Sequence, residues 1–131
     1  MKYFTIKELC KSRVAQERGI DNTPSPEAVA NLTKLVDNVL DPLREWYGKP
    51  IHIESGYRCP ALNKAVGGVP TSYHLKGCAA DIDMGDKDDN KPIFDYIVKN
   101  LPFTECGWEG GGRWVHVGYV EGKNDKEVFS A

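Results

Sequence analysis

The longest periodic segment of the sequence, from about residue 26 to residue 46, predicts one long helix with a single apolar face. Its apolar residues recur at steps of three and four: Val29, Leu32, Val36, Val39, Leu40 and Leu43. Ser25 and Pro26 provide an N-cap and a first-turn proline, and Gly48 and Pro50 end the segment. An apolar stripe of this length must be covered by other elements, so we expect this helix to be the main core helix.

Several shorter segments predict the elements that pack around this helix. Apolar and polar residues alternate as in half-buried strands in three places: Ile51–Glu54, Cys78–Met84 and Trp114–Tyr119. Thr5 and Glu8 form a capping box that begins a short helix, a helical turn is expected at residues 63–66, and another helix is expected over residues 92–100. Residues 86–89 are expected to form a solvated turn, and residues from about 121 a loosely held tail. This mixture predicts an α+β fold.

Size and charge restrict the function classes. The chain has 131 residues, no internal repeat and no linker, so we expect a single domain over residues 1–131. Lys and Arg total 17 against 19 Asp and Glu, with no basic stripe, which excludes nucleic acid as the expected partner. The N-terminal residues contain no continuous apolar stretch, so we expect no signal peptide and no membrane segment. We therefore expect synthesis in the cytoplasm, as a monomer.

The four cysteines are not expected to bind zinc. They are widely spaced and form no C-x-x-C pair: Cys10, Cys59, Cys78 and Cys106. We expect reduced, mostly buried thiols, with a structural disulfide as the alternative.

Two histidines and an aspartate are the candidate residues for a metal site. His74 comes from a loop, and Asp81 follows seven residues later on a predicted strand, after a turn at Gly77. His116 lies on another predicted strand, where alternation places it opposite Val115 and Val117. Two imidazoles and one carboxylate supply three ligands of a tetrahedral zinc ion and leave the fourth position for water, which is typical of catalytic zinc.

The residues around these three side chains resemble a known family. The segment Ser72-x-His74-x-x-Gly77-x-Ala79-x-Asp81, with a later Trp114-x-His116, is similar to the zinc motif of the M15 peptidases, the D-Ala-D-Ala carboxypeptidases and L-alanyl-D-glutamate endopeptidases. Upstream, Ser55 to Asn63 resembles the family's S-G-Y-R-x-P-x-x-N segment. The resemblance implies a Hedgehog/DD-peptidase-like fold, in which helices pack against a small antiparallel sheet that holds the metal.

The resemblance also implies roles for individual residues. His74, Asp81 and His116 would bind one zinc ion, and Arg58 would steady a substrate carboxylate or a developing oxyanion. A guanidinium suits this role because its planar fork of donors matches a carboxylate. Ser72 and Tyr73 would bind substrate, although a loop cap at Ser72 and simple packing at Tyr73 are the alternatives.

One position departs from the family pattern. Better-known members carry Glu or Asp three residues before the last histidine, where this chain has Arg113, which cannot act as a base. We expect Glu109 to be the general base, since a glycine turn between two strands would bring it beside His116. Glu105 is the second candidate.

The predicted function is hydrolysis of amide bonds in bacterial peptidoglycan stem peptides by a zinc-bound water. The alternative is a non-catalytic zinc domain that binds the wall or another protein, which the altered position of Arg113 keeps open. The enzyme would reach the cell wall after release or export, as a host enzyme or as a phage or prophage lysin. The sequence leaves open whether cleavage is terminal or internal.

Overall fold

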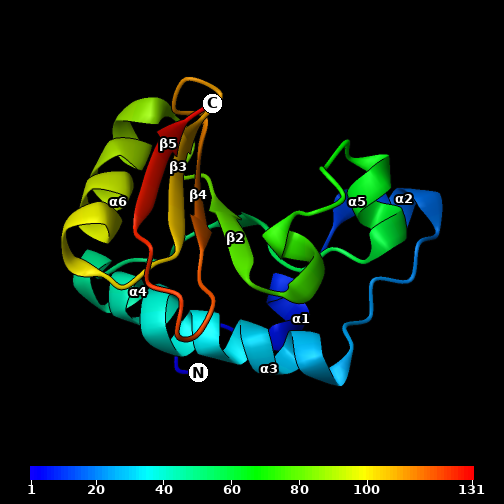
Figure 1. The fold of residues 1–131 in the computed structure, drawn as a ribbon. Coiled ribbons are helices and arrows are strands. Elements are labelled where there is room, and N and C mark those ends of the chain that lie inside the picture. Colours follow the sequence, from blue (N-terminus) through cyan, green and yellow to red (C-terminus); the bar gives the residue numbers. More distant parts are fainter.

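A five-stranded sheet forms the centre of the computed structural model, which describes residues 1–131 (Figure 1). Its strands are β1 (Ile53–Ser55), β2 (Ala79–Ile82), β3 (Glu105–Glu109), β4 (Trp114–Gly118) and β5 (Glu127–Ser130). The strand order is β1-β2-β4-β3-β5, and all neighbours are antiparallel except β3 and β5, which are parallel. The predicted α+β class is therefore confirmed.

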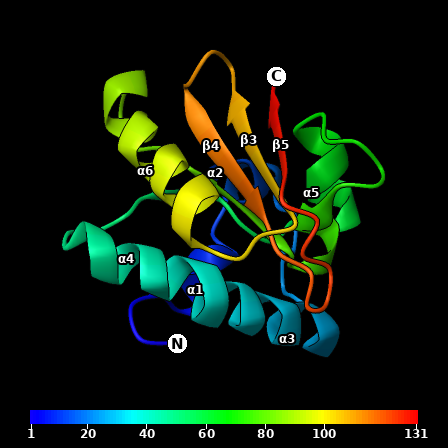
Figure 2. The same cartoon turned by 60° about the vertical axis from the view of Figure 1, so that its left-hand side comes forward.

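The long predicted helix is present as three consecutive segments. They are α3 (Pro26–Leu35), a π-helical stretch η1 (Val36–Leu40) and α4 (Asp41–Tyr47), which together run along one end of the sheet (Figure 2). The hydroxyl of Ser25 accepts the Ala28 amide hydrogen, as its predicted N-cap role requires. The apolar face is covered as expected, because Leu32, Leu35, Val36, Val39, Leu40 and Leu43 have no exposed surface.

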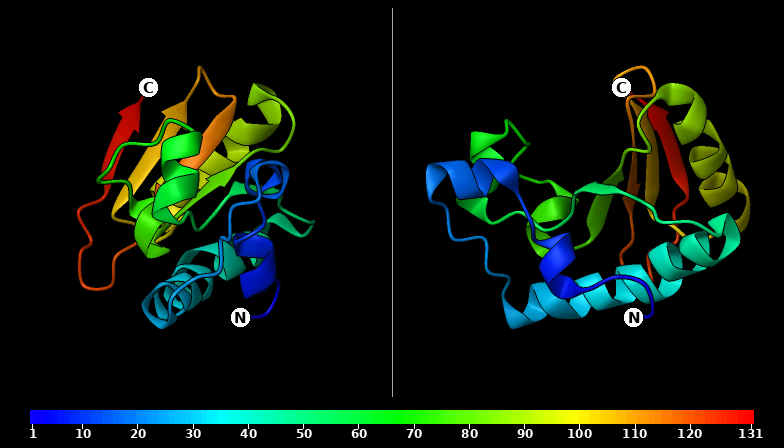
Figure 3. Two further views of the ribbon diagram at one scale, coloured as in Figure 1. Left: turned by 90° about the vertical axis from the view of Figure 1, so that its right-hand side faces the viewer. Right: turned by 180° about the vertical axis from the view of Figure 1, so that it is seen from behind.

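The remaining helices lie on the two sides of the sheet. They are α1 (Ile6–Leu9), α2 (Arg13–Arg18), α5 (Pro60–Ala65), the 3₁₀ helix η2 (Tyr73–Lys76) and α6 (Lys87–Asn100). Helix α6 packs on β3 and β4, whereas α2 and α5 lie together on the opposite side (Figure 3). One cluster of 20 buried residues joins the helices and the sheet into a common core.

The solvated turn expected at residues 86–89 is wrong. Asp86 is the N-cap of α6, and its carboxylate accepts the Asp89 amide hydrogen at 2.8 Å. Asp88 and Asp89 then occupy the first turn, where negative charge is favoured by the helix dipole. Helix α6 therefore begins five residues before the expected start at Pro92, which is accommodated inside the helix.

The loosely held tail expected after residue 121 is also wrong. Residues Glu127–Ser130 form β5, which pairs in parallel with β3 from Glu105 to Trp108. The ring of Phe129 lies directly over Gly107, where a Cβ atom would come within 2.5 Å of it. The absence of a side chain at Gly107 is what allows β5 to pack here, and it brings the end of the chain to the functional site.

Candidate metal centre

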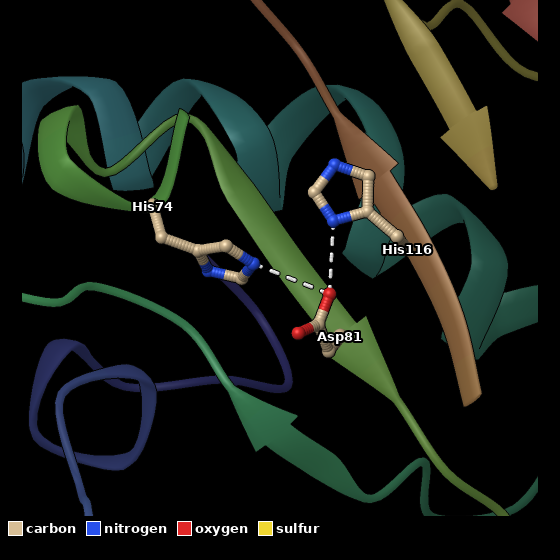
Figure 4. A group of neighbouring side chains, drawn as sticks. All are labelled: His74, Asp81 and His116. Atoms are coloured by element: carbon tan, nitrogen blue, oxygen red, sulfur yellow. Dashed lines mark hydrogen bonds and ion pairs between the residues drawn. The ribbon is translucent and has the colours of Figure 1, made fainter. Parts of the chain in front are cut away.

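Three different elements bring His74, Asp81 and His116 together (Figure 4). Asp81 on β2 lies directly opposite His116 on β4 in the antiparallel register. His74 lies on η2, whose N-cap Ser72 accepts the His74 amide hydrogen through its hydroxyl at 3.2 Å. Gly77 then turns the chain from η2 toward β2 in the left-handed conformation, with φ of 75°. The turn expected at Gly77 is thus present.

The ligand atoms of the three residues converge on one point. Oδ1 of Asp81 lies 3.2 Å from Nε2 of His74 and 2.9 Å from Nδ1 of His116. One potential ligand atom from each residue lies within 4.8 Å of the other two, and all three residues are buried. This spacing is compatible with a shared metal ion, which would sit between the three atoms.

The hydrogen bonds behind the imidazoles orient the ligand nitrogens. Nδ1 of His74 lies 2.6 Å from the carbonyl oxygen of Gly56, which only accepts, so Nδ1 carries a hydrogen and Nε2 is the nitrogen that faces Asp81. When the His74 ring is neutral, this Nε2 has a lone pair that is free to bind a metal ion. His116 is held in the same manner, with Nε2 against the carboxylate of Glu105 and Nδ1 toward Asp81. Such outer partners are typical of metal-binding histidines, so the residues present fit a zinc ion.

The pKa values of Asp81 and His116 in the metal-free site show that the site favours positive charge. Burial alone raises the pKa of Asp81, but His74 and His116 outweigh it and hold the pKa well below its usual range. Burial lowers the pKa of His116, yet hydrogen bonds to Asp81 and Glu105 outweigh it and raise the pKa to about 9. In the metal-free site, a proton on His116 therefore supplies the positive charge that a bound metal ion would otherwise supply.

Arg58 is anchored beside the same carboxylate. Its guanidinium donates to Ser55 Oγ at 3.0 Å, to Asn63 Oδ1 at 3.3 Å and to Asp81 Oδ2 at 3.3 Å. The backbone of Arg58 also donates to the carbonyl of His74 at 3.0 Å. Three of its five N–H groups are thus occupied, and the other two remain available to an oxygen of a ligand.

The two candidate bases lie on β3 but contact different groups. Glu109 is opposite Trp114 in the β3–β4 register, and its Oε2 accepts the indole hydrogen of Trp114 at 2.7 Å. The hairpin between them contains Gly110, Gly111 and Gly112, all with positive φ. Glu105 instead contacts Nε2 of His116, so it lies on the other side of the imidazole ring from the ligand atom Nδ1.

A cavity of about 670 Å³ opens over the three candidate ligand residues, and we call it the ligand-side cavity. The residues predicted from sequence all line it: Arg58, Ser72, Tyr73, His74, Asp81, Glu105, Glu109 and His116. Phe129 also lines it, with its ring centroid 6.1 Å from that of His116. Phe129 was not predicted as a site residue, because the segment that contains it was expected to form a loosely held tail. A lone aromatic residue in a charged segment was the only signal of its role.

Arg113, which replaces the acid found in better-known relatives, does not enter this cavity. It is exposed, and its guanidinium carbon lies 5.8 Å from the centre of the Trp114 ring. The Arg113 side chain therefore lies outside the cavity, on the exposed surface of the β3–β4 hairpin.

Comparison with known proteins gives the family. No helix of the structure has both the length and the apolar character needed to cross a membrane. No curated protein matches the sequence significantly. The family model described as peptidase M15 matches residues 2–118, which include the metal-ligand candidates, Arg58 and both candidate bases. The chain therefore belongs to the peptidase M15 family.

Proposed function

We propose that this peptidase is zinc-dependent and hydrolyses amide bonds in peptidoglycan stem peptides. The observation that carries the proposal is the convergence of His74, Asp81 and His116 within 4.8 Å, next to a cavity that also contains Arg58 and Glu109. Three protein ligands suit a catalytic zinc site, in which the fourth position is left for water or substrate. Stem peptides are the substrates that the family resemblance suggests.

In the proposed reaction, Glu109 moves the proton and Arg58 stabilises charge. A bound zinc ion would lower the pKa of a coordinated water to about 7 and polarise a substrate carbonyl. Glu109 takes the proton from the attacking water and returns it to the leaving amine. The two free N–H groups of Arg58 donate to the carbonyl oxygen as negative charge develops on it.

Glu109 is the better candidate for the general base, because the carboxylate of Glu105 already contacts Nε2 of His116. A carboxylate that accepts the Nε2 hydrogen of His116 fixes the tautomer and orientation of a metal ligand. Glu109 has one carboxylate oxygen fixed by Trp114 and the other free of protein hydrogen bonds. Its orientation is therefore set while one oxygen remains available to water. Ser72 and Tyr73, which also line the cavity, are proposed to bind the substrate backbone.

Muropeptide hydrolysis tests the function directly. Purified protein is expected to cleave soluble muropeptides, to lose this activity in a chelator and to recover it when zinc is restored. Mass spectrometry of the products identifies the bond. Zinc retention without any hydrolysis would instead support the non-catalytic alternative, a zinc domain that only binds the wall or a partner protein.

A further inference from the structure

Phe129 lies in the same cross-strand row as two of the candidate metal ligands. Asp81 on β2 pairs with His116 on β4. Gly107 on β3 pairs with His116 on one side and with Phe129 on β5 on the other. Directly paired residues project from the same face of a sheet. Because the middle position of the row is a glycine, no side chain of β3 lies between the two rings of His116 and Phe129, whose centroids are 6.1 Å apart.

The ring of Phe129 has no part in the hydrophobic core. It neither belongs to the cluster of 20 buried residues nor packs against that cluster. The other residues of β5 are exposed, and Val128, the second apolar residue of the strand, faces the opposite side of the sheet with 48% of its surface exposed. Phe129 is half-buried and lines the ligand-side cavity. Core packing therefore does not explain why this strand carries a phenylalanine.

Strand β5 also lies outside the part of the chain that the family model matches. The match ends at residue 118, whereas β5 covers Glu127–Ser130. The wall that Phe129 adds to the cavity thus comes from a segment that the family model does not cover.

The aromatic ring on β5 lies between two carboxylates. Glu105, Gly107 and Glu109 alternate along one face of β3, so a ring over Gly107 lies between the two glutamates. Glu105 contacts His116, and the free oxygen of Glu109 is assigned to water in the proposed reaction. The surface that remains for a substrate at this place is the ring, and covering an apolar surface with an apolar group is favourable.

We infer that Phe129 is a specificity-determining residue, whose ring contacts an aliphatic side chain of a substrate residue next to the bond that is cut. The inference rests on the proposed function, because a carbonyl that reacts beside His116 brings the adjoining substrate side chain to the ring. It concerns which side chain the site accepts and applies equally to terminal and internal cleavage.

Peptides that differ in one side chain test the preference. Mass spectrometry of digested muropeptides first identifies the bond, and synthetic peptides then carry alanine, glycine, glutamate or lysine at the residue on either side of it. At one of the two positions, alanine is expected to exceed glycine in kcat/KM by about tenfold or more, as one methyl group does in an apolar pocket. A preference for glutamate or lysine at both positions would show that charge and not the ring decides, and would overturn the inference.

Substitutions on β5 assign the preference to the ring. In Phe129→Ala, the ratio of kcat/KM between the alanine and glycine peptides is expected to fall from about tenfold to near one, with zinc content unchanged. Val128→Ala is the matched control and should keep the wild-type ratio, since Val128 lies on the same strand but does not line the cavity. An equal loss on both peptides would mean that the ring only supports the fold, and an unchanged ratio would mean that it does not contact substrate. Either result overturns the inference.

Phe129→Leu is the second variant, in case Phe129→Ala fails to fold. Leucine keeps an apolar wall but is smaller than phenylalanine, so peptides with valine or leucine at the same position should gain in kcat/KM relative to alanine. An unchanged order of these aliphatic peptides would contradict the inference. Wild-type protein without zinc-dependent cleavage of any peptide would instead remove the proposed function itself.

Discussion

Asp81 and His116 face each other across β2 and β4, with Oδ1 of Asp81 2.9 Å from Nδ1 of His116. The second oxygen of the same carboxylate accepts from Arg58 at 3.3 Å. A single buried side chain therefore links the proposed metal site to the proposed anion-stabilising residue. Changes at Asp81 should therefore affect both the metal site and Arg58.

Asp81→Ala is expected to abolish metal retention. The substitution removes one of the three proposed ligands and leaves Arg58 without its carboxylate partner, which is costly for a largely buried charge. Zinc content by elemental analysis after dialysis should fall from one ion per chain to background, and hydrolysis should disappear. The exposed Asp125→Ala is the control and should retain its zinc. Stoichiometric zinc in Asp81→Ala would reject this ligand set.

Glu109→Gln should separate proton transfer from metal binding. Removing a general base costs about 10²–10⁴-fold in rate. The turnover number on muropeptides should fall by that amount while the zinc content stays at one ion per chain, because Glu109 contacts Trp114 and no metal ligand. Glu127→Gln, on the neighbouring strand β5, is the matched control for the same chemical change. Unchanged turnover in Glu109→Gln would exclude it as the base.

Glu105→Ala should show the opposite pattern. Loss of a carboxylate that holds a metal-binding histidine weakens metal affinity by about 10–100-fold. Competition with a chromogenic chelator should reveal this loss, and saturating zinc should restore much of the activity. An affinity equal to that of the wild type, together with activity lost at saturating zinc, would show that Glu105 and not Glu109 is the base.

The stability of the metal-free protein should fall between pH 6.5 and about 9. The pKa of His116 is raised from 6.5 to about 9 in the folded state, so its contribution is complete below pH 6.5 and is lost as the pH rises through the folded value. Asp81 acts in the opposite direction, because its lowered pKa makes its contribution complete above about pH 3.8 and lost only in stronger acid. Urea unfolding in chelator at pH 6, 7.5 and 9 measures the fall. His116→Gln should flatten it, whereas the exposed His52→Gln should not.

Gly107→Ala should destabilise the sheet by displacing Phe129. A Cβ atom at residue 107 would lie 2.5 Å from the Phe129 ring, and overpacking of this kind costs about 1–3 kcal/mol. Urea unfolding should show that loss, and Phe129→Ala should relieve much of it in the double variant. Additive effects of the two substitutions would mean that the ring does not limit residue 107.

The metal-ligand candidates could be named from the sequence because local patterns and the resemblance to the M15 motif mark them, whereas the β2–β4 register that places Asp81 opposite His116 is a long-range pairing. Gly77 marks the turn between His74 and Asp81, and strand alternation separates His116 from its apolar neighbours. The start of α6 was missed because the cluster of acids after Gly85 was interpreted as a solvated turn. Asp86 in fact caps the helix, and the helix dipole favours the acids that follow.

Strand β5 was not predictable from local rules. Most of its residues are exposed, and it lacks the apolar alternation that predicts a strand. Its pairing depends on space over Gly107, a residue that lies about twenty positions earlier in the chain. Only the tertiary structure reveals that Phe129 borders the metal centre.

The paired hydrogen bonds between η2 and the Arg58 loop have a thermodynamic consequence. The His74 ring donates to the Gly56 carbonyl, and the Arg58 amide donates to the His74 carbonyl, so the two segments are ordered together. If metal occupancy steadies this loop and thereby strengthens substrate binding, linkage requires substrate to strengthen metal binding by the same factor. Saturation with a peptide ligand would then lower the dissociation constant of the metal ion by that factor.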